Sequence, residues 1–330
     1  MFGKWFINFI KNFWLEIFLI LFIATGNFFL IFNLKSLPSP IFGGDLWNHL
    51  GIMEHIAQGG SIFENAQFKD IKAQWVPYLY HVLIVGFSKI FNLELLKGVL
   101  FASIFFSILS FLSYYFLIFF FFKDKILANV AGLIGTMFSI PIIKYLDFSI
   151  AIIMPLFFLS ITYFFKKNNL LSSFFLGIIL GFSFLSHYQT AINTSIFTAF
   201  LFFQNVFLFF KEKKFKEIKN LIINFSIAIL IFLSISMLYW YWPIFEYKLK
   251  TINDLNIYGW PNFENFLNKL SYAFEILKSW LNFSFPNIFF TIFFIFGIIC
   301  LFFFSFPQKK YFKVLLILSF ILIFHFFITS

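Results

Sequence analysis

The chain has 330 residues, of which 61% are hydrophobic and only 12% are charged, and its mean hydropathy is +0.92. This balance excludes a soluble globular enzyme, because runs such as 116–122 would leave a large apolar surface in water. The net charge of +10 comes from lysine alone. The lysines stand in short clusters between apolar runs, a pattern typical of membrane topology that argues against nucleic-acid binding.

Apolar stretches of about 20 residues, the length that crosses the roughly 30 Å hydrocarbon layer as a helix, recur along the chain. We expect an all-α polytopic membrane protein with about nine transmembrane helices. They are predicted at 13–32, 98–122, 126–143, 148–165, 170–186, 188–210, 221–242, 286–306 and 311–328. A weaker apolar run at 76–92 is short and contains a proline, a histidine and a lysine, so we expect it to lie at the interface or dip into the bilayer.

Lysine-rich loops stay on the cytoplasmic side of a membrane, which sets the predicted orientation. Lysine clusters precede the first span and recur at 123–125, 166–167, 211–219 and 309–313. The polar loop 33–75 is net negative and is expected outside. An outside loop at residue 75 and an inside cluster at residue 123 require an odd number of crossings between them. Either 76–92 is interfacial, which we expect, or Lys123 and Lys125 are an exception to the lysine rule.

Three parts of the chain follow from this pattern. We expect a membrane core over 1–243 that includes the outside loop 33–75, a second outside loop over 244–285, and C-terminal membrane helices over 286–330. The chain stops just after an apolar run, which is compatible with a longer protein or with missing partner subunits. Its single cysteine excludes an intrachain disulfide.

The first outside loop and the run after it hold three of the five histidines. Prolines and glycines predict a turn before Asp45, which is placed to cap a helix that ends near Gly59. On that helix Asp45 and His49 are four residues apart and share a face. Glu54 and His55 lie to either side of this face.

Three interpretations of this cluster remain open. In the first, Asp45 is only a helix cap and the histidines are interfacial side chains. In the second, Asp45, His49 and His81 hold a divalent cation, although the chain contains no tight ligand motif such as HExxH. In the third, a carboxylate near a low-dielectric boundary, with a histidine on the next turn, acts as a general base toward a hydroxyl.

Several motifs resemble those of the GT-C-fold glycosyltransferases, polytopic enzymes that take a sugar from a polyprenyl-phosphate carrier, and especially their poorly characterised bacterial and archaeal relatives. The matched pieces are GGDLWNHLGIMEHIAQGG after the first span, WVPYLYHVLIVGFSKIFN, and LGIILGFSFLSHYQTAI further along. The resemblance covers roughly residues 4–210. It implies a GT-C-like helical bundle in the plasma membrane, at the cell envelope, with an active site on the extracytoplasmic face.

The resemblance, for Asp45, His187 and Gln189, and the residue pattern, for the others, predict roles for particular residues. Asp45 matches the catalytic base of an inverting transfer from the lipid-linked donor to a glycan, lipid or protein acceptor, with His49 as its supporting partner. Residues expected to bind substrate are Glu54, His55, His81, His187, Gln189, Lys248, Tyr258 and Trp260. No acidic pair follows Asp45, so no cofactor is required and a metal-dependent version is not supported.

Two other classes of function compete with the enzyme. A multi-span transporter or flippase of a lipid-linked or small polar substrate would also be polytopic, but charges inside the predicted spans, the usual mark of an ion path, are nearly absent. A non-catalytic membrane assembly protein is the third class. A test for sugar transfer separates these alternatives.

Overall fold

The computed structural model describes residues 2–32, 45–63, 77–137 and 144–246. The chain divides into two units, Met1–Lys250 and Thr251–Ser330. The described residues belong to the first unit, so the predicted spans 286–306 and 311–328 and most of the loop 244–285 lie outside them.

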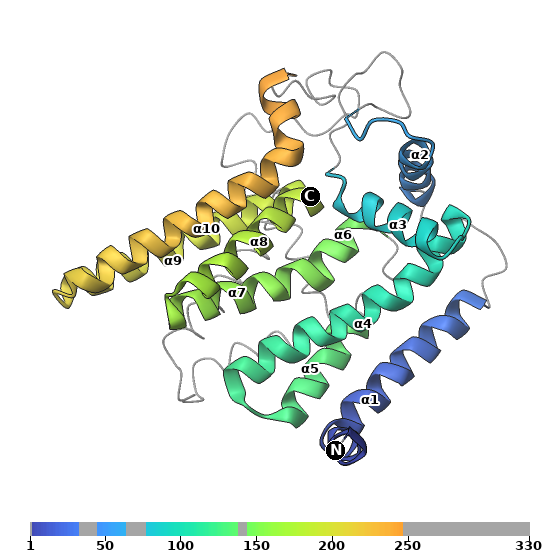
Figure 1. The fold of residues 1–330 in the computed structure, drawn as a ribbon, viewed down its shortest axis with the longest axis horizontal. Helices are drawn as coiled ribbons and strands as arrows, with labels where there is room; N and C mark the ends of the chain where they lie inside the picture. The colour runs from blue at the N-terminus through green and yellow to red at the C-terminus, as the bar shows by residue number, and fades with distance from the viewer. Residues whose placement is uncertain (1, 33–44, 64–76, 138–143, 247–330) are drawn as a thin grey trace, which may run out of the picture. The chain divides into compact units, whose positions relative to one another are not determined.

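Helices and the turns between them make up the described part of the chain (Figure 1). In order they are α1 (Phe2–Phe32), α2 (Asp45–Ala57), α3 (Leu79–Ile90), α4 (Leu95–Phe122), α5 (Lys125–Met137), α6 (Tyr145–Phe148), the π-helical turn η1 (Ser149–Ile153), α7 (Met154–Lys167), α8 (Leu170–Ser186), α9 (Tyr188–Lys211), α10 (Phe215–Tyr241) and the π-helical turn η2 (Trp242–Glu246).

Five helical segments within the described ranges are long and apolar enough to span a membrane. They are Asn12–Phe32, Leu95–Phe122, Tyr145–Lys167, Thr190–Lys211 and Phe215–Tyr241. Large apolar side chains such as Phe203, 67% exposed, and Leu230, 64% exposed, point away from the bundle as lipid-facing residues do. The described part of the chain is therefore all-helical and has the features of an integral membrane protein.

Three further apolar helices are shorter: α5 and α8, with 13 and 17 residues, and α3, with 12. At 1.5 Å per residue, α3 reaches only about 18 Å. That is less than the roughly 30 Å of hydrocarbon, so α3 is too short to cross the bilayer. The described lengths of α5 and α8, about 20 and 26 Å, do not reach full spans at 126–143 and 170–186 either. The expectation that 76–92 does not form a full span therefore agrees with the length of the helix found there.

The lysines of the α4–α5 and α7–α8 turns lie at one end of the helices, which we call the lysine end. There the Lys125 ammonium group donates to the Asn12 carbonyl at 2.8 Å, which brings the α4–α5 turn to the start of the first span. Lys166, at the end of α7, lies over the Phe120 ring of α4, 4.9 Å from its centroid. The α4–α5 and α7–α8 turns thus lie at the same end, as the alternation of lysine-rich loops predicts.

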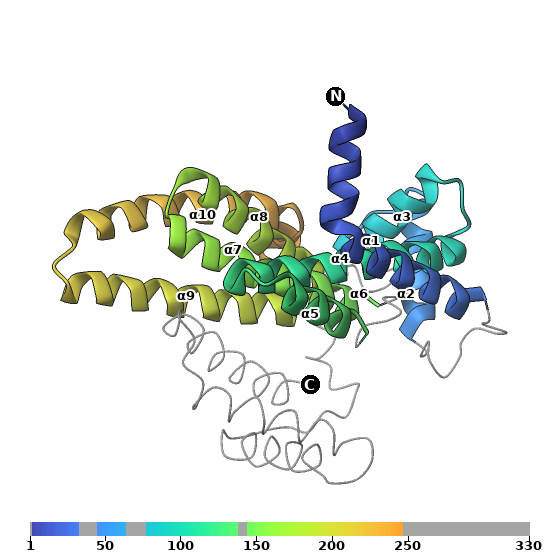
Figure 2. The same cartoon turned by 90° about the horizontal axis from the view of Figure 1, so that it is seen from below.

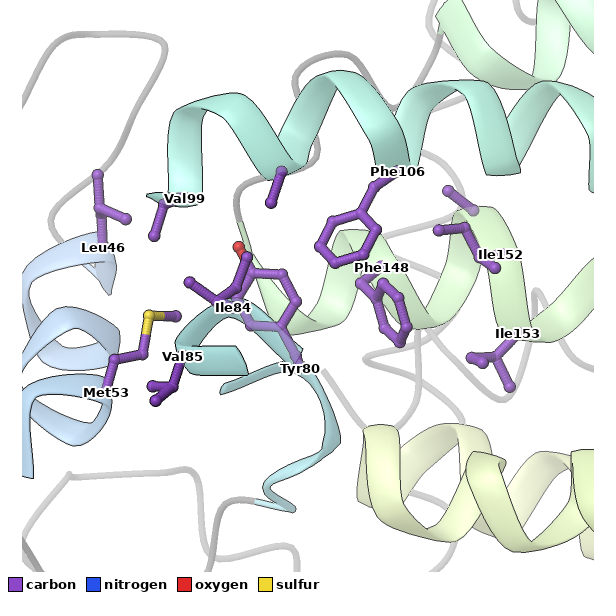
Figure 3. Packing of buried hydrophobic residues seen from close by; sticks show 12 residues of the cluster. Leu46, Met53, Tyr80, Ile84, Val85, Val99, Phe106, Phe148, Ile152 and Ile153 are labelled. Atoms are coloured by element: carbon purple, nitrogen blue, oxygen red, sulfur yellow. The ribbon is translucent and has the colours of Figure 1, made fainter. Parts of the chain in front are cut away.

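The loop helices α2 and α3 are packed against the opposite end of the bundle rather than projecting from it (Figure 3). Tyr80 of α3 contacts Phe106 of α4 and Phe148 of α6, with ring centroids 5.9 and 5.8 Å apart. Leu46 and Met53 of α2 are fully buried in the same cluster. Burying each side chain contributes about 1.5–3 kcal/mol, so the cluster fixes α2 and α3 against α4 and α6.

The long helix from Tyr145 to Lys167 is interrupted by η1, a widened turn that Pro155 explains. Proline has no N–H to bond the carbonyl of Ala151, and its ring crowds that carbonyl. The widened hydrogen bond lies one residue before the proline, where the Met154 N–H donates to the Ser149 carbonyl, five residues back, instead of to a carbonyl four residues back. This π-helical step changes the direction in which α6 presents its side chains.

One carboxylate is buried inside the membrane part of α1. Glu16 is 7% exposed, and its Oε1 accepts hydrogen bonds from the Tyr115 hydroxyl of α4 at 3.0 Å and from Nδ2 of Asn129 on α5 at 3.3 Å. Polar bonds between helices are a main means of association in lipid, where apolar contacts with neighbouring helices and with lipid tails are alike. Glu16 therefore ties α1 to α4 and α5.

We expect Glu16→Leu to lower the stability of the protein by about 1–3 kcal/mol, because two buried donors lose their acceptor. Glu16→Gln keeps an acceptor oxygen and is expected to cost less. The thermal unfolding midpoint in detergent measures both, with Phe18→Leu, a change at a lipid-facing position of the same helix, as the control. Equal midpoints for Glu16→Leu and the wild type would contradict this role.

Candidate functional site

Two buried histidines from different helices meet at the end of the bundle opposite the lysines, which we call the histidine end. His49 of α2 is 6% exposed and His81 of α3 is fully buried. Nδ1 of His49 lies 2.9 Å from Nε2 of His81. One of these two nitrogens must carry the proton and donate it, and the other must accept the hydrogen bond. The tautomers of the two rings are therefore coupled.

Tyr145, the first residue of α6, joins this pair to a third histidine. Its ring lies against His49, with centroids 4.7 Å apart, and against His187, with centroids 4.9 Å apart. The His81 ring is 6.2 Å away. His49, His81, Tyr145 and His187, which we call the histidine–tyrosine cluster, therefore come from four separate segments of the chain.

His187 lies in the abrupt turn between α8 and α9. Its backbone is extended, with φ −160° and ψ 135°, and α9 begins at the next residue. The turn is closed on both sides, because the His187 N–H donates to the Ser183 carbonyl at 3.4 Å and its own carbonyl accepts from Ala191 at 3.0 Å. A single residue thus reverses the chain and holds a 4% exposed imidazole against Tyr145.

Hydroxyl groups continue from the cluster along α6, α8 and α9. The Ser149 hydroxyl, in η1, donates to Oγ1 of Thr190 at 2.6 Å and lies 2.9 Å from Oγ of Ser186. Further along, Ser183 and Thr194 are hydrogen-bonded at 2.9 Å. These contacts hold the α8–α9 turn against the π-helical turn, which is what positions His187 beside Tyr145.

Burial keeps two of the histidines neutral. It lowers the pKa of His81 from 6.5 to about 3, helped by the nearby His49. The Pro77 carbonyl opposes this slightly, although it does not reach hydrogen-bond geometry with Nδ1 of His81. Burial also lowers the pKa of His187 to about 4. At neutral pH both rings are therefore uncharged and can accept a proton or a hydrogen bond.

A tyrosine next to this pair is also perturbed. Burial raises the pKa of Tyr80 well above its ordinary value, and the charge of Asp147 acts in the same direction. The Tyr80 hydroxyl is buried and has no hydrogen-bond partner within the described ranges. Such groups are rare in folded proteins and mark a place that calls for an explanation.

The predicted helix of the first loop is confirmed. α2 begins at Asp45, and Gly59 follows it with φ +88°, while the Gly60 N–H donates back to the His55 carbonyl at 2.9 Å. This is the glycine-terminated helix end that the sequence indicates. The helix places the Asp45 backbone one turn before His49, and the Asp45 side chain lies outside the described part.

Glu54 and His55 lie on other faces of α2. Glu54 is exposed and accepts a hydrogen bond from Gln58 at 2.8 Å. The His55 ring covers the position that a side chain on Gly60 would occupy. The structure therefore brings His49, His81 and His187 together around Tyr145, and it places Glu54 beside Gln58 and His55 beside Gly60.

The remaining predicted residues cannot be placed in the site. Lys248, Tyr258 and Trp260 lie outside the described residues, and Gln189 is described only as part of the first turn of α9. Among the side chains that the structure describes, no group of three or more His, Cys, Asp or Glu residues is arranged to hold a metal ion. The cation interpretation also needs the Asp45 side chain, which is not among them.

Tyr145 is the residue that the sequence interpretation missed. It lies in the short connection before the predicted span 148–165, next to Lys144 and Asp147. The available signal was a group of polar residues, KYLD, at the histidine end of a span. Nothing in that pattern indicates that the tyrosine, rather than its charged neighbours, contacts three histidines.

Comparisons with known proteins give one informative match. No family model matches the chain, and no solved structure matches it. The chain is 35% identical over 115 residues to the uncharacterized protein MJ1080 of Methanocaldococcus jannaschii. The match spans 34% of this chain and 84% of that protein, so the relative is the shorter of the two.

Proposed function

The chain belongs to the same family as the uncharacterized protein MJ1080 of Methanocaldococcus jannaschii, and we propose that it is a GT-C-like glycosyltransferase with about nine spans. It transfers a sugar from a polyprenyl-phosphate carrier to an acceptor at the membrane surface. One observation carries the proposal. Residues that the resemblance assigns to one site, His49 of the first loop and His187 of the SHYQT segment, lie on the same tyrosine, 4.7 and 4.9 Å from its ring centroid.

The roles of the residues follow from their positions. Asp45 takes the proton from the acceptor hydroxyl as the sugar is transferred with inversion, since a carboxylate at the start of α2 is one turn from the buried imidazole of His49. His49 positions this end of α2 through its contact with His81. His187 and Tyr145 form the opposite wall, and their rings contribute flat surfaces and polar edges of the kind that bind sugars.

The proposal places the histidine end outside the cytoplasm. The lysine-rich turns at 123–125 and 166–167 share the other end of the helices, and such turns remain cytoplasmic. The acceptor is then an extracytoplasmic glycan, lipid or protein, and the membrane is the plasma membrane. A cysteine introduced at Asn48, which is exposed on α2, and one at Lys213 are expected to react with impermeant reagents from opposite sides.

The direct test is transfer from defined donors. We expect the purified protein in nanodiscs to move the label from at least one member of a panel of radiolabelled polyprenyl-phosphate sugars to a water-soluble or lipid acceptor. Boiled protein and empty nanodiscs are the controls. If the whole panel is left intact while proteoliposomes carry a member of it across the bilayer, the protein is a flippase.

A transporter or flippase remains the second candidate because of one observation. The hydroxyl contacts Ser149–Thr190 and Ser183–Thr194 continue inward from the histidine–tyrosine cluster between apolar helices. Polar groups at such depth commonly line the path of a substrate or proton. The same panel, read as transfer in nanodiscs and as translocation in proteoliposomes, distinguishes the two candidates.

A further inference from the structure

Helix α1 changes direction before it enters its membrane-spanning part. Phe13 has a non-helical backbone, φ −126° and ψ 19°, so that residues 2–12 and 14–32 form two helical segments. Figure 2 shows the first segment turned steeply away from the second. A kink needs an identifiable cause, and α1 contains no proline near Phe13. The kink is instead stabilised by a side chain that belongs to another helix.

That side chain belongs to Lys125, the first residue of α5. Its ammonium group donates to the Asn12 carbonyl at 2.8 Å and lies 4.4 Å from the centroid of the Phe13 ring. A carbonyl that a kink releases from the helical ladder must find another donor. The α4–α5 turn therefore fixes the angle between the two segments of α1 through the contacts of Lys125.

The first segment has two chemically different sides in its helical register. With 3.6 residues per turn, its large apolar positions fall on one side and its lysines on the other. The apolar positions are Phe2, Trp5, Phe6, Ile7, Phe9 and Ile10, and the polar ones are Lys4, Asn8, Lys11 and Asn12. Such a helix, with aromatic residues opposite lysines, is typical of one that lies in the membrane interface.

More lysines surround the kink. Lys123 and Lys166 both lie over the Phe120 ring, 5.3 and 4.9 Å from its centroid, although they belong to different turns. Both are exposed, as is Lys125. The one acidic residue of the α4–α5 turn, Asp124, accepts the N–H groups of Ile126 and Leu127 at 2.8 and 3.1 Å and so caps α5.

We propose that residues 2–12 lie in the plane of the membrane surface at the lysine end. Together with Lys123, Lys125 and Lys166, they form a docking surface for the headgroups of anionic phospholipids. The aromatic side of the segment enters the acyl boundary, and its lysines and those of the two turns face the phosphates. Each lysine near an anionic surface favours such lipids by about fivefold at most.

The geometry is tested by spin labelling. Single cysteines at each of positions 2–11, in a Cys300→Ser background, are labelled in nanodiscs, and their accessibility to oxygen and to a water-soluble nickel complex is measured. We expect a period of about 3.6 residues, with positions 5, 6 and 9 in the acyl region and 4, 8 and 11 in water. Uniform exposure to water along the segment would overturn the proposal.

The lipid is tested by competition between headgroups. Spin-labelled phosphatidylglycerol and phosphatidylcholine are compared as annular lipids of the protein reconstituted in phosphatidylcholine. We expect a preference for phosphatidylglycerol that falls several-fold in the triple variant Lys123→Gln, Lys125→Gln, Lys166→Gln. Lys89→Gln with Lys97→Gln, which removes two exposed lysines elsewhere, should leave the preference unchanged.

Loss of the preference through misfolding is distinguished by two further variants. Lys123→Gln with Lys166→Gln keeps the Lys125 contact to Asn12 and should still lower the preference. Lys125→Arg keeps the charge and should retain it. An unchanged preference in both the triple and the double variant would show that these lysines do not select the lipid.

Discussion

Asp45→Asn is expected to abolish sugar transfer while the protein remains folded and inserted. The amide has the shape of the carboxylate and can still accept a hydrogen bond at the start of α2, but it cannot take a proton from an acceptor hydroxyl. A positioned general base contributes roughly 10²- to 10⁴-fold to a rate, so kcat should fall by about this factor. The measurement is kcat and KM with the donor identified from the panel.

Matched variants show whether the loss is specific to Asp45. Glu94→Gln also removes a carboxylate, one that is exposed and paired with Lys97 at 2.9 Å just before α4, and should leave the rate unchanged. His49→Ala should reduce the rate less than Asp45→Asn, because His49 acts through the position of α2. Full activity in Asp45→Asn would reduce Asp45 to a helix cap and remove the main catalytic residue of the proposal.

Acidification is expected to destabilise the protein between about pH 6.5 and pH 4. The native state holds His81 neutral down to about pH 3 and His187 down to about pH 4, whereas the unfolded chain binds protons at both histidines from about 6.5. Stability falls wherever the unfolded state binds more protons and pH decreases. At about pH 5 each histidine should cost about 2 kcal/mol.

The thermal unfolding midpoint in nanodiscs, measured across this pH range, checks the prediction. Replacing both histidines with groups that do not titrate, His81→Gln and His187→Asn, should lower the midpoint at neutral pH but flatten its dependence on pH. A double variant with the slope of the wild type would assign the acid sensitivity to other groups.

Much of the fold could be predicted because it depends on local signals. The apolar runs at 98–122 and 221–242 correspond to α4 and α10, which begin a few residues earlier, at Leu95 and Phe215. Hydrophobicity predicts the apolar length of a span well but not where its helix begins, since lysines and other polar residues can extend a helix into the interface. The helical segment 2–12, which contains two lysines, was not predicted for the same reason.

Local signals predicted the helix of the candidate site, whereas the sequence named His49, His81 and His187 as site residues without showing how they contact one another. The limits of α2, which begins at Asp45 and ends before Gly59 with its positive φ, follow from turn residues within a few positions. The contact of His49 with His81 joins residues 32 positions apart, and periodicity gives no information about such a pair. The direction of the Tyr145 side chain is harder to predict. It is set by the widened turn η1, which Pro155 explains from ten residues away.

The widened turn at Ser149–Ile153 makes the length of this helix adjustable by one residue. Deleting one residue there would let the turn close into a regular α-helical turn, so that the helical register before and after it was kept and Tyr145 stayed between His49 and His187. A deletion in the regular part of α7 would instead rotate everything before it by about 100° and turn Tyr145 away from the two imidazoles. This turn is therefore the place in the helix where the chain can lose a residue and keep the contacts of Tyr145.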